Sequence, residues 1–248
     1  MALSGDATAD RVARHIGIVA VSAEGAALCY RTICTEAPRE MGEHAHPEIT
    51  MHTHPLSEYM AFIRRADWPG VASLLLSSTG RVAAAGAVFA ICPDNTAHQA
   101  FDLVAAESPI PWLHIARVVA AAAQHGGFRR LGVLGTRYLM EGPVYAQALH
   151  RYGIACLIPD RPDRERVNTI IFEELVCGLF HPASRAYLHE LIGKLADRGC
   201  DAVVLGCTEI PLIVEPGRAP LPTLDSTRLL ARAALLRARR TEATDAQG

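Results

Sequence analysis

Two short polar segments of this chain each follow a compact run of apolar residues. Residues 206–209 read Gly-Cys-Thr-Glu and follow Ala-Val-Val-Leu, and residues 93–96 read Pro-Asp-Asn-Thr and follow Val-Phe-Ala-Ile-Cys. An apolar run that stops at a polar turn is typical of a buried parallel strand that leads into a helix. Open α/β sheets bind their ligands at this end of the strands. The thiol of Cys207 and the carboxyl group of Asp94 are therefore candidate reactive groups.

A thiol and a carboxyl group on opposite sides of a ligand suit a two-base reaction at a stereogenic carbon. One group removes the proton next to a carboxylate, and the other delivers a proton to the opposite face. This chemistry needs neither a metal nor a phosphate-binding loop. A free cysteine at a tight turn is also a common core residue, and it is the similarity of the two segments that favours a catalytic role for Cys207.

The second reactive group has an alternative, because Cys92 lies two residues before Asp94. In an extended segment the two side chains would share a face. Pro93 between them fixes the backbone, so we take Asp94 as the reactive group. A carboxyl group has a reference pKa near ~3.9 and a thiol near ~8.5, and burial beside a substrate carboxylate would raise the pKa of Asp94.

The overall composition is that of an ordinary globular protein. Of the 248 residues, 50% are hydrophobic and 20% are charged, and the formal net charge is −2. This balance gives no reason to expect nucleic acid or a membrane surface as a partner, and no apolar run approaches the ~20 residues of a transmembrane helix. The seven cysteines include no Cys-x-x-Cys pair, which favours a reducing compartment, the cytoplasm.

The pattern of apolar runs predicts alternating strands and helices. Strands are expected at residues 15–22, 48–54, 87–92, 130–134, 154–158 and 201–205. Helices are expected at residues 68–85, 97–106, 112–125, 142–152, 164–179, 182–198 and 223–240, with a loop at 38–46. Such alternation implies an α/β fold with parallel sheets flanked by helices. Residues 108–111, which contain two prolines, are the expected linker between two similar lobes.

Residues 206–211 (Gly-Cys-Thr-Glu-Ile-Pro) and 95–98 (Asn-Thr-Ala-His) resemble the two signature motifs of the aspartate/glutamate racemase superfamily. The resemblance covers residues 15–230 and implies two pseudo-symmetric Rossmann-like lobes with the active site in the cleft between them. The first lobe would comprise residues 1–110 and 215–248, and the second residues 111–214. The resemblance further implies a homodimeric isomerase, a racemase of aspartate, glutamate or a related acidic amino acid that works without pyridoxal phosphate or any other cofactor.

The sequence departs from the family at one position. The family has a cysteine directly before Asn-Thr, where this chain has Asp94. Three kinds of enzyme follow: a racemase that uses Cys207 and Asp94, a strongly one-sided racemase, or a relative that uses Cys207 alone. The last resembles arylmalonate decarboxylases or maleate isomerases, which act on small dicarboxylates. A non-catalytic protein that binds acidic ligands in the same cleft is a further alternative.

Polar residues near the two segments are expected to hold a small carboxylate substrate. Hydroxyl, amide and backbone donors would stabilise the carbanion as charge moves onto oxygen, and we assign this role to Asn95, Thr96, Thr136 and Thr208, together with Glu209. Threonine and asparagine after a strand are also ordinary helix caps. No linear pattern identifies the side chain of the substrate.

Four histidines form two His-x-His pairs, at His44 and His46 and at His52 and His54. Alternating imidazoles suit Zn²⁺ or Fe²⁺, as in the metal site of a cupin. The α/β alternation argues against a cupin barrel, so we expect no metal. We interpret the segment as a substrate-facing loop, with His54 as a candidate substrate contact, and a solvated strand is the alternative.

Overall fold

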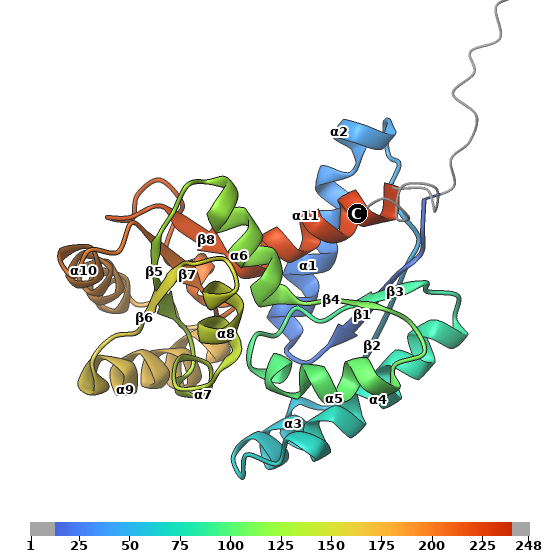
Figure 1. The fold of residues 1–248 in the computed structure, drawn as a ribbon, viewed down its shortest axis with the longest axis horizontal. Helices are drawn as coiled ribbons and strands as arrows, with labels where there is room; N and C mark the ends of the chain where they lie inside the picture. Colours follow the sequence, from blue (N-terminus) through green and yellow to red (C-terminus); the bar gives the residue numbers. More distant parts are fainter. Residues whose placement is uncertain (1–12, 240–248) are drawn as a thin grey trace, which may run out of the picture.

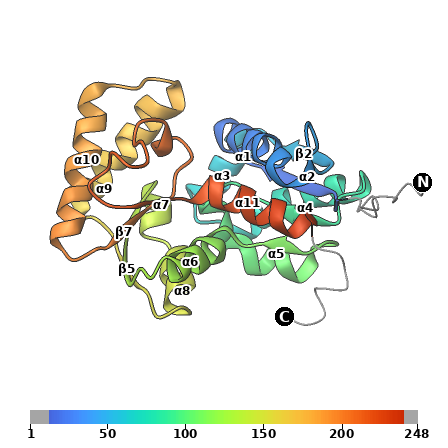
Figure 2. The same cartoon turned by 90° about the horizontal axis from the view of Figure 1, so that it is seen from above.

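The structure is a computed structural model that describes residues 13–239. Residues 1–12 and 240–248, which the sequence assigns to the first lobe, lie outside this range. The described chain forms two four-stranded parallel sheets, each flanked by helices (Figures 1 and 2). The α/β class with two lobes, predicted from the sequence, is confirmed. No helix within residues 13–239 is long and apolar enough to cross a membrane.

The first sheet has the strand order β2-β1-β3-β4. Its strands are β1 (Ile16–Ala20), β2 (Ile49–Thr53), β3 (Phe89–Ile91) and β4 (Trp112–Leu113). The helices around it are α1 (Ala23–Glu36), α2 (Pro38–Met41), α3 (Leu56–Ile63), α4 (Trp68–Ala84), a 3₁₀ turn (Thr96–Ala100) and α5 (Phe101–Glu107). The segment expected as a loop at residues 38–46 thus begins with the short helix α2.

The second sheet has the corresponding order β6-β5-β7-β8. Its strands are β5 (Arg130–Leu134), β6 (Ala155–Leu157), β7 (Ala202–Leu205) and β8 (Thr223–Asp225). The helices of this part are α6 (Ile115–His125), α7 (Arg137–Met140), α8 (Val144–His150), α9 (Arg161–Thr169), a π-helical turn (Ile170–Glu174), two 3₁₀ turns (Leu175–Cys177 and Ile210–Leu212) and α10 (Pro182–Asp197). The chain ends in α11 (Ser226–Arg239).

Each central strand is buried on both faces, which explains its continuous apolar sequence. In β1, Ile16 and Ile18 face the core beneath α1 and α11, whereas Val19 faces the core beneath α3 and α4. In β7, Val204 and Val203 likewise face opposite cores. The period of two along a strand therefore fills four cores, one on each face of each sheet.

The two sheets are built to the same register. Gly17 pairs with Ala90 in the first sheet, and Gly132 pairs with Val203 in the second. Both glycines allow a helix to pack directly on the sheet, because a Cβ atom at Gly17 would lie 2.7 Å from Val82 of α4, and one at Gly132 would lie 2.7 Å from Leu195 of α10. Because these two glycines are equivalent, each residue of the first central strands can be matched to a residue of the second.

Because of two short edge strands, the chain passes from one sheet to the other at later residues than the sequence suggested. Residues 112–113 form β4 of the first sheet, before the helix that was expected to begin at residue 112. Residues 223–225 form β8 of the second sheet, before the helix expected from residue 223. The sheets thus divide at residues 113 and 225, not at 110 and 214. Strands of two or three residues are too short to show a period of two, so the flanking helical pattern hid them.

The last helix of each half packs on the other half. α6 follows β4 of the first sheet, but its Val119 and Ala120 lie in a core of the second sheet. α11 follows β8 of the second sheet, but its Leu230 and Ala234 lie in a core of the first. The two exchanged helices pack against each other between the sheets (Figure 1).

Candidate active site

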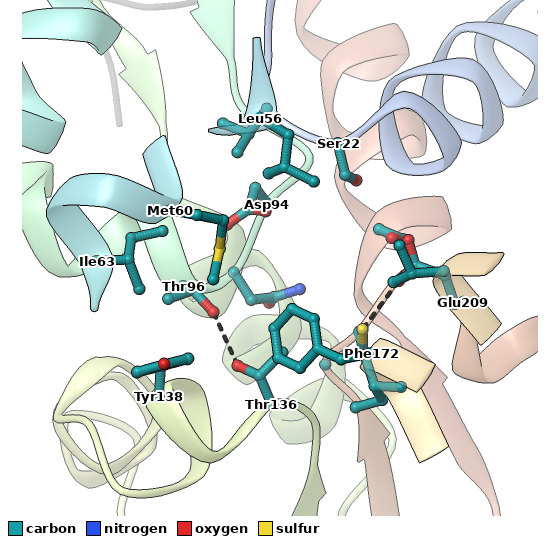
Figure 3. Close-up of a pocket in the computed structure, with 17 residues that line it drawn as sticks. Ser22, Leu56, Met60, Ile63, Asp94, Thr96, Thr136, Tyr138, Phe172 and Glu209 are labelled. Carbon is teal, nitrogen blue, oxygen red and sulfur yellow. Dashed lines mark hydrogen bonds between the residues drawn. The ribbon is translucent and has the colours of Figure 1, made fainter. Parts of the chain in front are cut away.

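A cavity lies where the carboxyl ends of the central strands of both sheets meet. Its space, counted together with the solvent at its open side, is about 590 Å³. Seven of the eight site residues expected from the sequence line it: Asp94, Asn95, Thr96, Thr136, Cys207, Thr208 and Glu209. Figure 3 shows labelled side chains from both halves of the chain pointing into the same space. His54 is the expected site residue that does not line the cavity.

Asp94 and Cys207 occupy equivalent positions in the two halves. Because Ala90 corresponds to Val203 in the strand register, Asp94 corresponds to Cys207, four residues further along in each case. Cys92 corresponds instead to Leu205, is fully buried, and packs in the core beneath α4. Of the two candidates for the second reactive group, Asp94 therefore faces the cavity and Cys92 does not.

Cys207 carries its proton in this environment. Its thiol is buried and donates a hydrogen bond to Oε2 of Glu209 at 2.9 Å. Burial raises the pKa of Cys207 well above its ordinary value of 9.0, and the negative charge of Glu209 raises this pKa further. At neutral pH a thiol with such a pKa is protonated, so it can act as a proton donor and is not a thiolate.

Asp94 has a pKa close to neutrality. Burial raises the pKa of its carboxyl group from 3.8 to about 6, and the charge of Glu209 acts in the same direction. The backbone N–H of Ala97 donates to Oδ1 of Asp94 at 2.8 Å and opposes part of this rise. At pH 7 to 8 the carboxyl group is therefore ionised and is a stronger base than an ordinary aspartate.

His98 holds the turn that carries Asp94. Its Nδ1 donates to the backbone oxygen of Asp94 at 2.7 Å, and its Nε2 accepts from the backbone N–H of Ile115 at 3.2 Å. Burial lowers the pKa of His98 to about 4. The neutral ring therefore joins the Asp94 turn to the first residue of α6.

Asn95 connects the two halves of the chain. Its Nδ2 donates to Oγ of Ser226 at 2.9 Å, and its Oδ1 accepts from the hydroxyl of Tyr145 at 2.6 Å. Ser226 in turn donates to the backbone oxygen of Leu205, the last residue of β7. Both ends of the carboxamide are thus engaged. The side chain braces the Asp94 turn against the strand that leads to Cys207.

The Tyr145→Phe variant is expected to be less stable than wild type by about 1–3 kcal/mol, because it leaves the buried Oδ1 of Asn95 without a partner. Urea unfolding monitored by circular dichroism would measure this difference. The matched control is Tyr152→Phe, on a half-buried tyrosine after α8 that makes no contact with the cavity. A Tyr145→Phe variant as stable as the control would show that the Tyr145–Asn95 hydrogen bond contributes nothing.

Threonine hydroxyl groups from both halves of the chain also line the cavity. Thr96 and Thr136, one from each half, are joined by a hydrogen bond of 3.1 Å (Figure 3). Thr136 also caps α7 by accepting from the N–H of Leu139 at 3.3 Å. The capping and substrate-binding interpretations of Thr136 therefore do not exclude each other.

Ser22 is a cavity residue that the sequence interpretation missed. It caps α1 by accepting from the backbone N–H of Gly25 at 3.3 Å. A Cβ atom at Gly25 would lie 2.7 Å from the oxygen of Pro93 and 2.8 Å from Cγ2 of Thr208. Glycine at this position thus lets the N-terminus of α1 approach both reactive turns. The signal was the polar residue that ends the first strand, followed by small residues that start a helix.

The histidine segment lies away from the cavity. Nδ1 of His52 is 2.9 Å from Oγ of Ser78, and Nε2 of His54 is 3.1 Å from Oγ of Ser77, so both rings lie on α4. Burial lowers the pKa of His52. Within residues 13–239, no three His, Cys, Asp or Glu side chains are grouped so that they could hold a metal ion. The structure places His52 in the edge strand β2, as the alternative interpretation had it, with His44 and His46 in the preceding loop. His54 directly follows the strand and does not line the cavity.

Comparison with known proteins agrees with this arrangement. Residues 16–234 match the model of the Asp/Glu/Hydantoin racemase family. The chain belongs to this family. By family, it is a racemase-type isomerase.

Two solved structures of the racemase family resemble the whole fold. A candidate Asp/Glu racemase from Yersinia pestis is 32% identical, with a TM-score of 0.84 over 92% of this chain and 100% of that one. An aspartate racemase homologue from Pyrococcus horikoshii is 26% identical, with a TM-score of 0.80 over the same shares. The glutamate racemase of Pseudomonas paraeruginosa is 31% identical over 155 residues, which are 60% of this chain and 56% of that protein.

The cavity has an apolar wall, built from two elements, that the sequence analysis did not predict. The wall consists of Leu56, Met60, Ile63, Ile171, Phe172 and Val176. The first three come from α3, and the others come from the turns after α9, which replace the last part of a predicted helix. Leucine, isoleucine and methionine on a helix are read as core residues unless the fold is known. This wall could therefore be found only in the structure.

Proposed function

We propose that this protein is a cofactor-independent amino-acid racemase in which Asp94 and Cys207 exchange protons with the α-carbon from opposite faces. One observation carries the proposal. The two groups occupy equivalent positions in the two halves of the chain, line the same cavity, and differ in protonation at neutral pH. A base on one side and an acid on the other are what inversion requires.

The reaction begins with the ionised carboxylate of Asp94 and the protonated thiol of Cys207. Asp94 takes the α-proton from the enantiomer whose C–H bond faces it, and the electron pair of that bond moves onto the substrate carboxylate. Cys207 then gives its proton to the opposite face of the planar carbon. The product is the other enantiomer, and the enzyme is left with protonated Asp94 and a Cys207 thiolate, the form that accepts that enantiomer in the reverse direction.

The surrounding donors suit the charge that develops on the substrate carboxylate. The hydroxyls of Ser22, Thr96 and Thr208 lie beside the reactive groups, and the N-terminus of α1 favours negative charge. Preorganised donors of this kind each contribute about 2.7–4 kcal/mol in other enzymes when the charge forms. The carboxyl group of Glu209 accepts a hydrogen bond from the Cys207 thiol and thereby orients it.

The pH dependence follows from the two protonation states. Exchange of the α-proton through Asp94 is expected to fall about tenfold per pH unit below pH about 6, because protonation removes the base. No basic limb is expected before pH 9, because the pKa of Cys207 is raised well above its ordinary value of 9.0. Values of kcat/KM from initial rates between pH 5 and 9.5 would measure the acidic limb and show whether any basic limb begins below pH 9. Activity that disappears between pH 7 and 8.5 would contradict this assignment.

The substrate expected from the resemblance is an acidic amino acid. The curated relative and the Pyrococcus horikoshii structure bear the names glutamate racemase and aspartate racemase homologue, and we retain aspartate and glutamate as comparison substrates. We also propose that the protein works as a homodimer in the cytoplasm. The seven cysteines, all unpaired in the structure, support a reducing compartment, and light scattering after size exclusion tests the dimer.

Proton exchange in D₂O tests the proposed function. Wild-type protein is incubated with a panel of L- and D-amino acids, and α-deuteration and inversion are followed by NMR and chiral chromatography. We expect each inverted molecule to carry deuterium, because Cys207 exchanges its proton with solvent. CO₂ release from an arylmalonate, or fumarate formation from maleate, would identify the single-thiol alternatives. Tight ligand binding without turnover would identify a binding protein, and either result would contradict the racemase proposal.

A further inference from the structure

We propose that the substrate carries an apolar side chain, of about the size of leucine or methionine, and not a second carboxylate. This inference rests on the proposed function, because it names the substrate class of the same site. It departs from the acidic substrate that the resemblance implies. The observations that carry it are the lining of the cavity and the placement of Arg64 and Arg137.

Two elements supply the apolar wall, one on each side of the cavity. Leu56, Met60 and Ile63 project from α3, and Figure 3 shows them on the same side as Asp94. Phe172 stands opposite, with Ile171 beside it on the π-helical turn. Turns of this kind are frequent at functional sites. A substrate held by its carboxylate at the reactive turns would direct its side chain against this wall.

The cavity offers no positive charge to a second carboxylate. Among residues 13–239, no lysine, arginine or histidine lines it, whereas Asp94 and Glu209 each contribute a carboxyl group. A carboxylate placed against Met60 and Phe172 would lose its hydration without gaining a partner. It would also be repelled by the negative charges already present. An apolar side chain incurs neither cost, and its burial against the wall stabilises the bound state.

Two arginines that follow cavity residues in the sequence lie outside the cavity. Arg64 and Arg137 line a separate, open hollow that shares only Ile63 and Tyr138 with it. Both arginines are exposed. Arg137 is further occupied by Tyr138, because its Nη2 donates to the tyrosine hydroxyl at 3.3 Å and its guanidinium lies 4.9 Å from the ring centre. Neither cation is placed to neutralise a substrate side chain of two or three carbons.

Three amino acids of nearly identical shape separate charge from size. Leucine, asparagine and aspartate all branch at the γ-carbon. In leucine this carbon bears two methyl groups, in asparagine the amide oxygen and nitrogen, and in aspartate the two carboxylate oxygens. We expect kcat/KM for α-deuteration by the wild-type protein to be at least about 10²-fold higher for leucine than for aspartate, with asparagine between them. Aspartate that reacts as fast as leucine would overturn the inference.

A single cation in the wall would change this preference. In Met60→Lys, the ratio of aspartate to leucine kcat/KM is expected to rise at least about tenfold, because the ammonium group can pair with the substrate carboxylate. The matched control is Ala61→Lys, which adds the same charge to an exposed position of α3 that does not line the cavity. A ratio that rises equally in both variants would indicate only long-range attraction and would contradict the assignment of Met60.

Ligand binding to the Cys207→Ser protein distinguishes failure of this inference from failure of the proposed function. If the wild-type protein exchanges no α-proton, the racemase proposal fails, but calorimetry with leucine and aspartate still reports what the cavity accepts. Tighter binding of leucine would support an apolar ligand. Equal or tighter binding of aspartate, or binding of neither, would overturn it.

Discussion

Asp94→Asn is expected to lower kcat/KM for racemisation by about 10²–10⁴-fold, the usual contribution of a positioned proton-transfer group. Asparagine keeps the size of the side chain and can still accept from the N–H of Ala97, the bond that Asp94 makes at 2.8 Å, but it cannot accept the α-proton. Cys207 cannot replace it at pH 7.5, because its raised pKa keeps the thiol protonated. Both inversion and α-deuteration should therefore be lost, as measured by NMR in D₂O.

The same substitution provides its own test of correct folding. The folded-state pKa of Asp94 is raised from 3.8 to about 6, so the folded protein binds this proton more tightly than the unfolded chain does. The associated stability is present below pH 3.8 and is lost as the pH rises through about 6. At pH 8 the partly buried charge therefore costs up to about 3 kcal/mol, and we expect Asp94→Asn to be more stable than wild type by about 1–3 kcal/mol.

The gain in stability should vanish at pH 4, where Asp94 is protonated in the folded protein. Urea unfolding at pH 4 and pH 8 would measure both values. An inactive variant that is less stable at pH 8 would point to a structural role for Asp94. An active variant would show that Asp94 is not the base.

Cys207→Ser is expected to abolish inversion to a similar degree, but with a different isotope result. Serine is too weak an acid to deliver a proton to the carbanion within a turnover. Asp94, however, can still remove the α-proton of the substrate. The enantiomer whose α-proton faces Asp94 should thus exchange with D₂O and return without inversion. The other enantiomer should not exchange. Chiral chromatography of the deuterated pool would distinguish these outcomes.

Two results would contradict the role given to Cys207. Inversion at the wild-type rate in Cys207→Ser would exclude the thiol as the second acid. Loss of exchange for both enantiomers would show that Asp94 does not remove the α-proton without Cys207, and this would contradict independent roles for the two groups. Cys200→Ser is the matched control, because Cys200 is also buried but packs in a core and does not line the cavity.

The fold was largely predictable from the sequence because its central strands are buried on both faces. Ala202–Leu205 and Phe89–Ile91 are short apolar runs that end at polar turns, and that pattern gives both the strand and the edge at which ligands bind. The edge strands β4 and β8 were not predictable. Their two or three residues acquire strand structure from pairing with a neighbour, a non-local interaction that periodicity does not report.

The reactive groups were predictable for a similar reason, whereas the substrate wall was not. Asp94 and Cys207 lie within the turns that end their strands, so local sequence places them. Met60 and Phe172 come from elements far apart in the sequence and meet only after the sheets are assembled. Asn95 shows the same limit in another way, because its partners Tyr145 and Ser226 lie 50 and 131 residues away.

The exchange of α6 and α11 has a consequence for how the gene could be divided. A fragment that ended after β4 would contain every strand of the first sheet, yet it would lack α11, whose Leu230 and Ala234 complete a core of that sheet. The remaining fragment would carry α11 with its apolar face uncovered. Each half of the chain thus contains a helix that completes a core of the other half. Selection would therefore act on both copies as a unit, and neither could be duplicated, lost or transplanted alone without exposing a core.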